Sequence, residues 1–138
     1  MKQIAPYLNF DGNCREAMTF YQRCLGGTLE VMSMADGGFD APPHLKDRVA
    51  HARITEGPAV LMASDTMMEG PPLQAGTNMF VNVQCSTPEE LDRYFAALSE
   101  GGTPSVPPHD AFWGDRFAML TDRYGVQWMF IADPAPQS

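Results

Sequence analysis

The sequence predicts an α+β chain made of two copies of one βαβββ module. Two amphipathic helices are each preceded by an alternating strand and followed by a Gly-Gly pair. The second helix repeats the first at a fixed spacing, since Thr87 follows Asn13 by 74 positions. A pair of apolar strands joined by a Gly-containing turn then follows each helix. The 138 residues suit a single domain with repeat halves at about 1–65 and 77–133.

The first half opens with a strand over residues 4–10, where apolar and polar residues alternate. Asn13 is expected to accept hydrogen bonds from the first turn of a helix, with Glu16 reaching back toward the start of that turn. One apolar stripe follows at i, i+3, i+4 and i+7, formed by Ala17, Phe20, Tyr21 and Cys24. Gly26-Gly27 supplies the left-handed backbone that ends a helix.

The second half repeats this order. Residues 79–83 read as a strand, and Thr87, Pro88 and Glu90 give the residue types of a strong helix start. The same stripe recurs at Leu91, Tyr94, Phe95 and Leu98. A second Gly-Gly pair then predicts the end of this helix.

Apolar strand pairs complete both halves, at residues 52–56 with 59–63 and at residues 118–122 with 126–131. Here the spacing falls to 66 positions, from Ile54 to Leu120, so the first half carries the longer connection. Residues 35–47 are rich in turn formers and aperiodic, which predicts that this connection is a loop. A second predicted loop, 65–77, joins the halves. The two halves together are expected to share a core and to leave a concave mixed sheet.

Charge and cysteine content exclude several classes of function. The net charge is −8, from 17 acidic and 9 basic residues, which disfavours nucleic acids and anionic membranes as partners. The sequence has no apolar leader and no stretch long enough to span a membrane. Three cysteines without metal-like spacing predict a reduced, cytoplasmic protein.

Several short motifs, in this order and spacing, resemble the vicinal oxygen chelate superfamily of glyoxalases, bleomycin-resistance proteins and dioxygenases, and within it the PhnB-like subgroup. The motifs are Pro6-Tyr7-Leu8-Asn9-Phe10-Asp11-Gly12-Asn13, Glu16-Ala17, Phe20-Tyr21, Leu25-Gly26-Gly27, His51-Ala52-Arg53-Ile54, Leu61-Met62-Ala63-Ser64-Asp65, Phe112-Trp113-Gly114-Asp115-Arg116-Phe117 and Thr121-Asp122-Arg123-Tyr124-Gly125-Val126-Gln127-Trp128. The resemblance implies the glyoxalase/bleomycin-resistance/dioxygenase fold and a symmetric homodimer. The subgroup is also labelled demethylubiquinone methyltransferase-like, but no glycine-rich nucleotide-binding turn supports that activity here.

The resemblance also implies a divalent metal held by His, Glu or Gln side chains from the first and last strand of each half. In this sequence those positions fall near Ala5, Leu61, Asn78 and Met129. Ligation needs a lone pair at each position, which alanine and leucine cannot supply, and the asparagine and the thioether are poor ligands alone. We therefore expect no metal and no other cofactor.

Five residues are candidates for contact with a ligand. His51 opens a strand next to that of Leu61 and could serve as a polar contact or general base, or could be a strand-end histidine satisfied by backbone or solvent. Asp115 and Arg116 could hold a polar group while Trp113 packs on its apolar part, or could form only a structural turn with a surface ion pair. Phe39 could close over a pocket, or could lie in a surface loop.

The expected function is that of a metal-free small-molecule binding protein. The alternative is a metal-dependent enzyme, a glyoxalase-type lyase or a dioxygenase, with displaced ligands drawn from His51, Glu56, Asp65 and Asp115. A structural or regulatory interaction module is the third possibility. The sequence leaves open whether any reaction is catalysed.

Overall fold

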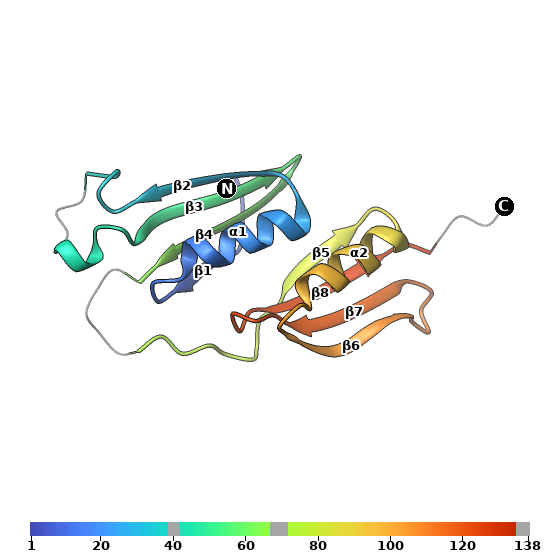
Figure 1. Ribbon diagram of the computed structural model, residues 1–138. Coiled ribbons are helices and arrows are strands. Elements are labelled where there is room, and N and C mark those ends of the chain that lie inside the picture. The colour runs from blue at the N-terminus through green and yellow to red at the C-terminus, as the bar shows by residue number, and fades with distance from the viewer. Residues whose placement is uncertain (39–41, 67–71, 135–138) are drawn as a thin grey trace. The chain divides into compact units, whose positions relative to one another are not determined.

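The computed structural model describes residues 1–38, 42–66 and 72–134. The chain divides into two compact units, Met1–Gln74 and Ala75–Ser138. Each unit holds one α-helix and one four-stranded sheet, and the strand order is equivalent, β1-β4-β3-β2 and β5-β8-β7-β6 (Figure 1). The predicted pair of βαβββ modules is therefore confirmed. The boundary falls within the segment predicted to join the halves, while a single domain stays a prediction.

The first unit runs β1 (Tyr7–Phe10), α1 (Cys14–Leu25), β2 (Thr28–Ser33), the short 3-10 helix η1 (Pro43–Leu45), β3 (Val49–Glu56) and β4 (Ala59–Asp65). Strand β1 pairs with β4 in parallel, and the other pairings are antiparallel. The predicted loop at residues 35–47 thus contains η1 in its described part. Strand β1 is shorter than predicted because the chain is not extended before Tyr7.

The second unit runs β5 (Val81–Cys85), α2 (Pro88–Leu98), β6 (Thr103–Asp110), β7 (Arg116–Thr121) and β8 (Gln127–Ala132). Strand β5 pairs with β8 in parallel, and β6, β7 and β8 form an antiparallel ladder. The prolines before His109 in the sequence suggest a loop there, but His109 lies in β6 opposite Phe117. Strand β6 is the edge of its sheet, where prolines are tolerated since their missing N–H groups would face outward.

Each helix lies across one face of its own sheet (Figure 1). The helical stripes predicted from the sequence are buried there, apart from the half-buried Cys24. Strand residues alternate in burial, because successive side chains point to opposite faces of a sheet. Each unit therefore has a core between its helix and one sheet face, and the other sheet face is free of its own helix.

The two helices start in different ways. At α2 the Thr87 hydroxyl accepts a hydrogen bond from the Glu90 N–H at 3.1 Å, as predicted, and the Glu90 carboxylate accepts one from the Ser86 N–H at 3.0 Å. At α1 the predicted cap is wrong, since the Asn13 side chain makes no capping hydrogen bond within the described part of the chain. The Asp65 carboxylate at the end of β4 accepts instead from the N–H groups of Gly12 and Cys14, at 2.8 and 3.0 Å.

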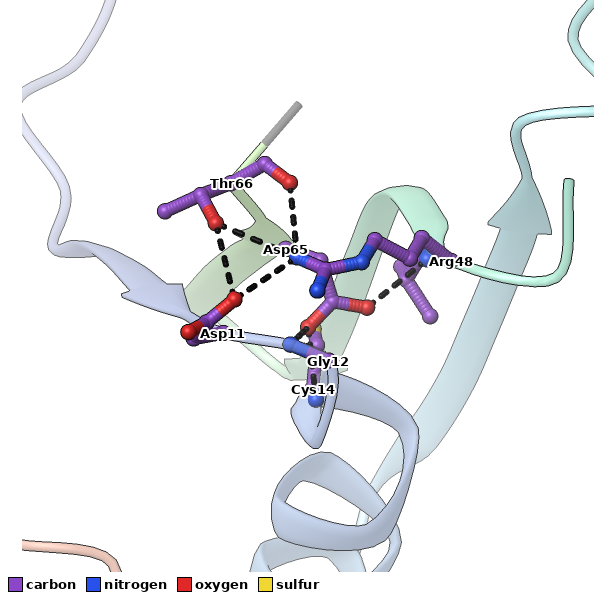
Figure 2. A network of polar contacts seen from close by, with 7 residues as sticks. Asp11, Gly12, Cys14, Arg48, Asp65 and Thr66 are labelled. Carbon is purple, nitrogen blue, oxygen red and sulfur yellow. Dashed lines mark hydrogen bonds and ion pairs between the residues drawn. The ribbon is translucent and has the colours of Figure 1, made fainter. Parts of the chain in front are cut away.

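Figure 2 shows that this carboxylate lies inside a larger polar network. The second oxygen of Asp65 accepts from the Val49 N–H at 2.9 Å, so one side chain joins the start of α1 to the start of β3. Beside it, the Arg48 guanidinium donates to Asp11 and to both oxygens of Thr66. Asp65 is only 2% exposed, and a buried carboxylate needs such donors to offset its lost hydration.

Candidate functional site

The open face of the first sheet is the face turned away from α1. Its neighbours in the strands, such as Ala52, Ile54 and Ala63, are buried on the helix side. Alternation along the strands then places the following side chains on the open face: Tyr7, Asn9, Thr28, Glu30, Met32, His51, Arg53, Thr55, Val60, Met62 and Ser64. The cross-strand register agrees, because Met32 faces His51 and Arg53 faces Met62.

Tyr7 and His51 form a pair on this open face. They come from β1 and β3, which flank β4, so the two side chains meet above the strand between them. The Tyr7 hydroxyl and His51 Nδ1 form a hydrogen bond of 3.1 Å, and the two ring centroids are 5.7 Å apart. His51, a predicted site residue, thus lies on the open face with its Nδ1 engaged by Tyr7. Its other ring nitrogen, Nε2, has no partner within the described residues.

Tyr7 is a candidate site residue that the sequence pattern did not single out. The available signal was its place in an alternating strand, in which Leu8 and Phe10 point toward the core. The hydrogen bond to a residue 44 positions away had no local signal.

Close to this pair lies a surface ion pair between Arg53 and Glu30, at 2.8 Å. The two residues face each other across β2 and β3, with side chains 46% and 65% exposed. Exposure to solvent weakens such a pair, so it contributes little to stability. The ion pair matters to the open face because Glu30 neutralises the charge of Arg53. Arg53 therefore adds no net positive charge beside the Tyr7–His51 pair.

The open face of the second sheet has a different character. Its side chains, by the same alternation, are Asn82, Gln84, His109, Phe117, Met119, Thr121, Gln127, Met129 and Ile131. Amides and apolar groups dominate, and cross-strand neighbours include Met119 with Met129 and Phe117 with Ile131. This face offers adaptable apolar surface with neutral hydrogen-bonding groups at its edge.

The predicted turn residues Trp113, Asp115 and Arg116 lie at the tip between β6 and β7. The Trp113 indole N–H donates to Asp115 Oδ2 at 2.9 Å. The Arg116 guanidinium instead forms ion pairs with Asp92 at 2.8 Å and with Asp110 at 3.3 Å. The hydrogen bond to Asp92 raises the pKa of the Arg116 guanidinium, so it stays charged. Asp115 and Arg116 are thus brought to different partners and do not form one clamp.

The implied metal positions do not fit a metal. Leu61 is 7% exposed and belongs to the helix side of its sheet, so neither its chemistry nor its direction suits ligation. Its equivalent in the second unit is Trp128. Ala63 pairs with Leu8 in the first sheet as Phe130 pairs with Val83 in the second, and Leu61 and Trp128 each lie two residues before those positions. Met129 lies one residue further on, on the open face.

The open-face neighbours of these positions do not supply a ligand set either. Strand β4 places Val60 and Met62 there, and β8 places Gln127 beside Met129. Asn78 and Ala5 precede β5 and β1 in irregular chain. Among the described residues, no three His, Cys, Asp or Glu side chains come together as a metal site.

Phe39, the predicted lid residue, lies outside the described residues. Asp65 at the end of β4 and Asp122 after β7 are buried carboxylates that accept hydrogen bonds from backbone N–H groups. Asp122 Oδ1 accepts from the N–H groups of Tyr124 and Val126, and its Oδ2 accepts from the Trp128 indole N–H at 2.8 Å. The sequence signal for Asp122 was an Asp just before a Gly-containing turn, which is typical of a turn carboxylate.

The geometry can now be set beside known proteins. Residues 2–131 match the sequence model of the family described as 3-demethylubiquinone-9 3-methyltransferase. The chain belongs to this PhnB-like family. A curated relative, the protein YjdN of Escherichia coli K12, is 31% identical over 137 residues, which cover 91% of this chain and 92% of YjdN.

Several solved structures agree with the fold. Protein PA1353 of Pseudomonas aeruginosa is 40% identical, covers 98% of this chain and 100% of its own, and superposes with a TM-score of 0.86. The PhnB protein of Bacillus cereus is 27% identical, covers 95% and 99%, and gives a TM-score of 0.72. A glyoxalase-related enzyme of Fulvimarina pelagi, 16% identical over 100% of this chain and 94% of its own, shares the fold with a TM-score of 0.65.

The predicted resemblance to the PhnB-like subgroup is therefore confirmed, and so is the glyoxalase/bleomycin-resistance fold. Within the described residues, no helix is long and apolar enough to cross a membrane.

Proposed function

We propose that this PhnB-like protein binds a small organic molecule against the open sheet face of one of its units without a metal ion. One observation carries the proposal. The positions where this fold offers ligands to a cation hold Ala5, Leu61, Asn78 and Met129, and Leu61 points into the core. Hydrocarbon has no lone pair for a cation, so binding must rest on other groups of these faces.

The groups present suit recognition by hydrogen bonds and apolar contact. The first open face contributes the Tyr7–His51 pair, and the Arg53 charge there is already neutralised by Glu30. The second contributes methionines and amides such as Gln84. Thioether side chains adapt to the shape of an apolar ligand, and a few polar groups then fix its orientation.

The proposal is tested by measuring the metal content of untagged protein after incubation with Ni²⁺, Zn²⁺ or Fe²⁺ and dialysis. We expect less than about a tenth of an equivalent to be retained, because a tight site needs three or more nitrogen or oxygen ligands. The His51→Ala variant, measured in parallel, is expected to retain the same small amount. About one equivalent held by the natural protein and lost in the variant would overturn the proposal in favour of a metal-dependent enzyme.

The groups available to that alternative have other partners or lie apart. Both oxygens of Asp65 accept from backbone N–H groups, and Asp115 accepts from Trp113. Glu56 is exposed at the end of β3, and His51 pairs with Tyr7. A metal-bound state of this set would require these contacts to be broken, and no observation favours it.

The name of the matching family points to methyl transfer, which we do not propose for this chain. The sequence contains no glycine-rich nucleotide-binding turn of the kind used by such enzymes. A methyltransferase of this chain should bind its methyl donor, S-adenosylmethionine. We expect no shift in melting temperature when that molecule is added, and a saturable shift would contradict the view taken here.

We also propose that the protein forms a symmetric homodimer, as its resemblance to small members of this superfamily implies. Size-exclusion chromatography with light scattering should give twice the chain mass of 15.2 kDa. A mass equal to one chain across the micromolar range would reject this assembly.

A further inference from the structure

We propose that the second unit contains a site for an organic cation with an alkylated ammonium group, formed by an aromatic cluster of His109, Phe112, Trp113 and Phe117 together with nearby carboxylates. The proposal deepens the proposed function and rests on it, because it names the class of ligand.

The aromatic cluster is unusually exposed for its size. Phe112 is 97% exposed and Trp113 is 51% exposed, at the tip of the β6–β7 connection. Single exposed apolar residues are common, but adjacent large rings held together on a surface are typical of an interaction site. The cluster continues from the turn onto the open face, where Phe117 lies opposite His109.

Neighbouring rings of the cluster contact each other in edge-to-face arrangements. The Phe112 and Trp113 centroids are 5.0 Å apart with ring planes at 90°, and those of Trp113 and Phe117 are 5.6 Å apart at 69°. His109 stands at 88° to Phe117, with centroids 6.1 Å apart. Ring walls at right angles form corners of the kind in which aromatic cages hold quaternary ammonium groups.

Trp113 is fixed in place by its hydrogen bond to Asp115. A carboxylate acceptor leaves additional electron density on the indole ring, and this strengthens the attraction of the ring face for a cation. Asp115 Oδ1 accepts no hydrogen bond from the described residues, so a negatively charged oxygen remains available beside the ring. The same carboxylate therefore orients the ring and supplies charge.

The surrounding charge favours a cation over a neutral or anionic ligand. Asp115 lies in the turn beside the rings, whereas Asp92 and Asp110 share the single positive charge of Arg116 on the side of the sheet that α2 covers. Net negative charge remains beside the rings, in a protein whose overall net charge is −8. Apolar walls next to excess carboxylate match a cation whose charge is spread over methyl groups, since such a cation loses little hydration on binding.

The experiment titrates ¹⁵N-labelled protein with choline, and in parallel with 3,3-dimethylbutanol, its uncharged isostere. The chain contains two tryptophans, so the indole N–H resonance of Trp113 can be compared with that of the buried Trp128 in one spectrum. We expect choline to shift the Trp113 signal with a millimolar dissociation constant and to leave Trp128 unchanged. The isostere should bind at least about tenfold more weakly.

Three variants localise the site. Trp113→Leu should weaken choline binding by about fivefold or more, followed through the backbone amide signal of Phe117. Asp115→Asn keeps an oxygen for the indole but removes the charge, and should weaken binding by about threefold at low salt and have little effect in 0.5 M salt. Asp47→Asn removes an exposed carboxylate from the first unit, away from its open face, and should leave the affinity unchanged.

Equal binding of choline and its isostere would overturn the proposal, as would equal shifts of both indoles or an affinity unaffected by Trp113→Leu and Asp115→Asn. Such a failure would leave a metal-free binding protein with a different ligand. A bound equivalent of metal would instead remove the proposed function itself, whatever the result with choline.

Discussion

The two units build the same module but start their helices with different chemistry. In the second unit, Thr87 and Glu90 cap α2 from within four residues of its start. In the first, the start of α1 depends on Asp65, a carboxylate contributed by a strand 51 positions away from Cys14. A local cap can form before the tertiary structure does, whereas a distant carboxylate can act only in the folded unit. The first unit should therefore be the more sensitive to loss of one side chain.

The largest expected effect comes from Asp65→Ala. The substitution leaves the N–H groups of Gly12, Cys14 and Val49 without their acceptor in a buried place. Hydrogen bonds to a charged group contribute about 1.5–3 kcal/mol each, so we expect a loss of at least about 4 kcal/mol in the free energy of unfolding, measured by urea denaturation. Asp47→Ala, at an exposed site of the same unit, is the control. A loss below about 1 kcal/mol would show that the cap is not needed.

Next in size are Gly27→Ala and Gly102→Ala, which test a feature that the two units share. A Cβ atom at Gly27 would lie 2.7 Å from the Thr55 carbonyl oxygen, and one at Gly102 would lie 2.5 Å from that of Thr121. Gly27 also has a φ of +89°, which side chains disfavour. We expect each variant to lose about 2–4 kcal/mol by the same urea measurement.

The control for these glycines is Gly76→Ala, where a Cβ atom would approach only the Asn78 side chain at 3.4 Å. If Gly27→Ala and Gly102→Ala unfold at the same urea concentration as this control, the close helix–strand approach is not a constraint in either unit.

Thr87→Ala tests the difference between the local cap of α2 and the distant Asp65 cap of α1. It removes one hydroxyl acceptor from an exposed helix start, while Glu90 remains beside the Ser86 N–H. Loss of such a cap costs about 1 kcal/mol. Urea unfolding should therefore show an effect several times smaller than that of Asp65→Ala, and comparable losses would contradict the distinction between local and distant caps.

The smallest effect concerns a buried thiol in each unit. Burial raises the pKa of Cys14 and of Cys85 from 9.0 to about 12. The unfolded chain loses these protons near pH 9, so their contribution to stability is fully present below pH 9 and falls as the pH rises toward 12. The urea midpoint of the natural protein should decline between pH 8.5 and pH 10.5. In Cys14→Ala and Cys85→Ala, each compared with its own midpoint at pH 7, the decline should be less steep.

The reactivity of the thiols gives an independent check on the same point. At pH 8 both buried thiols should react with a disulfide reagent only as fast as the protein opens, because the reactive thiolate is disfavoured. The half-buried Cys24 should react first. Immediate modification of Cys14 or Cys85 in folded protein would show that burial does not control these groups.

The sequence predicted the parts of the fold that depend on local pattern. Both helical stripes, the Thr87 cap and the order of the strands follow from periodicity and from residue types that are neighbours in the chain. The Asn13 cap was wrong because a competing acceptor, Asp65, arrives from a distant strand. His109 was misplaced because prolines weaken a strand pattern, and only the sheet order shows that β6 is an edge.

The candidate site was less predictable than the fold. His51 and Trp113 stay predictions as ligand contacts, and the structure places His51 half-buried and Trp113 exposed. Their hydrogen-bond partners differ in distance along the chain. Trp113 donates to its near neighbour Asp115, whereas His51 forms a hydrogen bond with Tyr7 across β4. Arg116 pairs with Asp92 from α2 and with Asp110, partners that the sequence reasoning about Asp115 and Arg116 did not include.

By itself the sequence determined the repeat, the amphipathic helices and the chemistry of the residues at the implied metal positions, because these depend on side-chain type and on short spacing. Tertiary structure alone decided which face of each sheet stays open, which carboxylate caps α1 and which partners engage Tyr7 and Arg116. The physical reason is that a hydrogen bond or an ion pair is set by distance in space, and chain position limits that distance only for close neighbours.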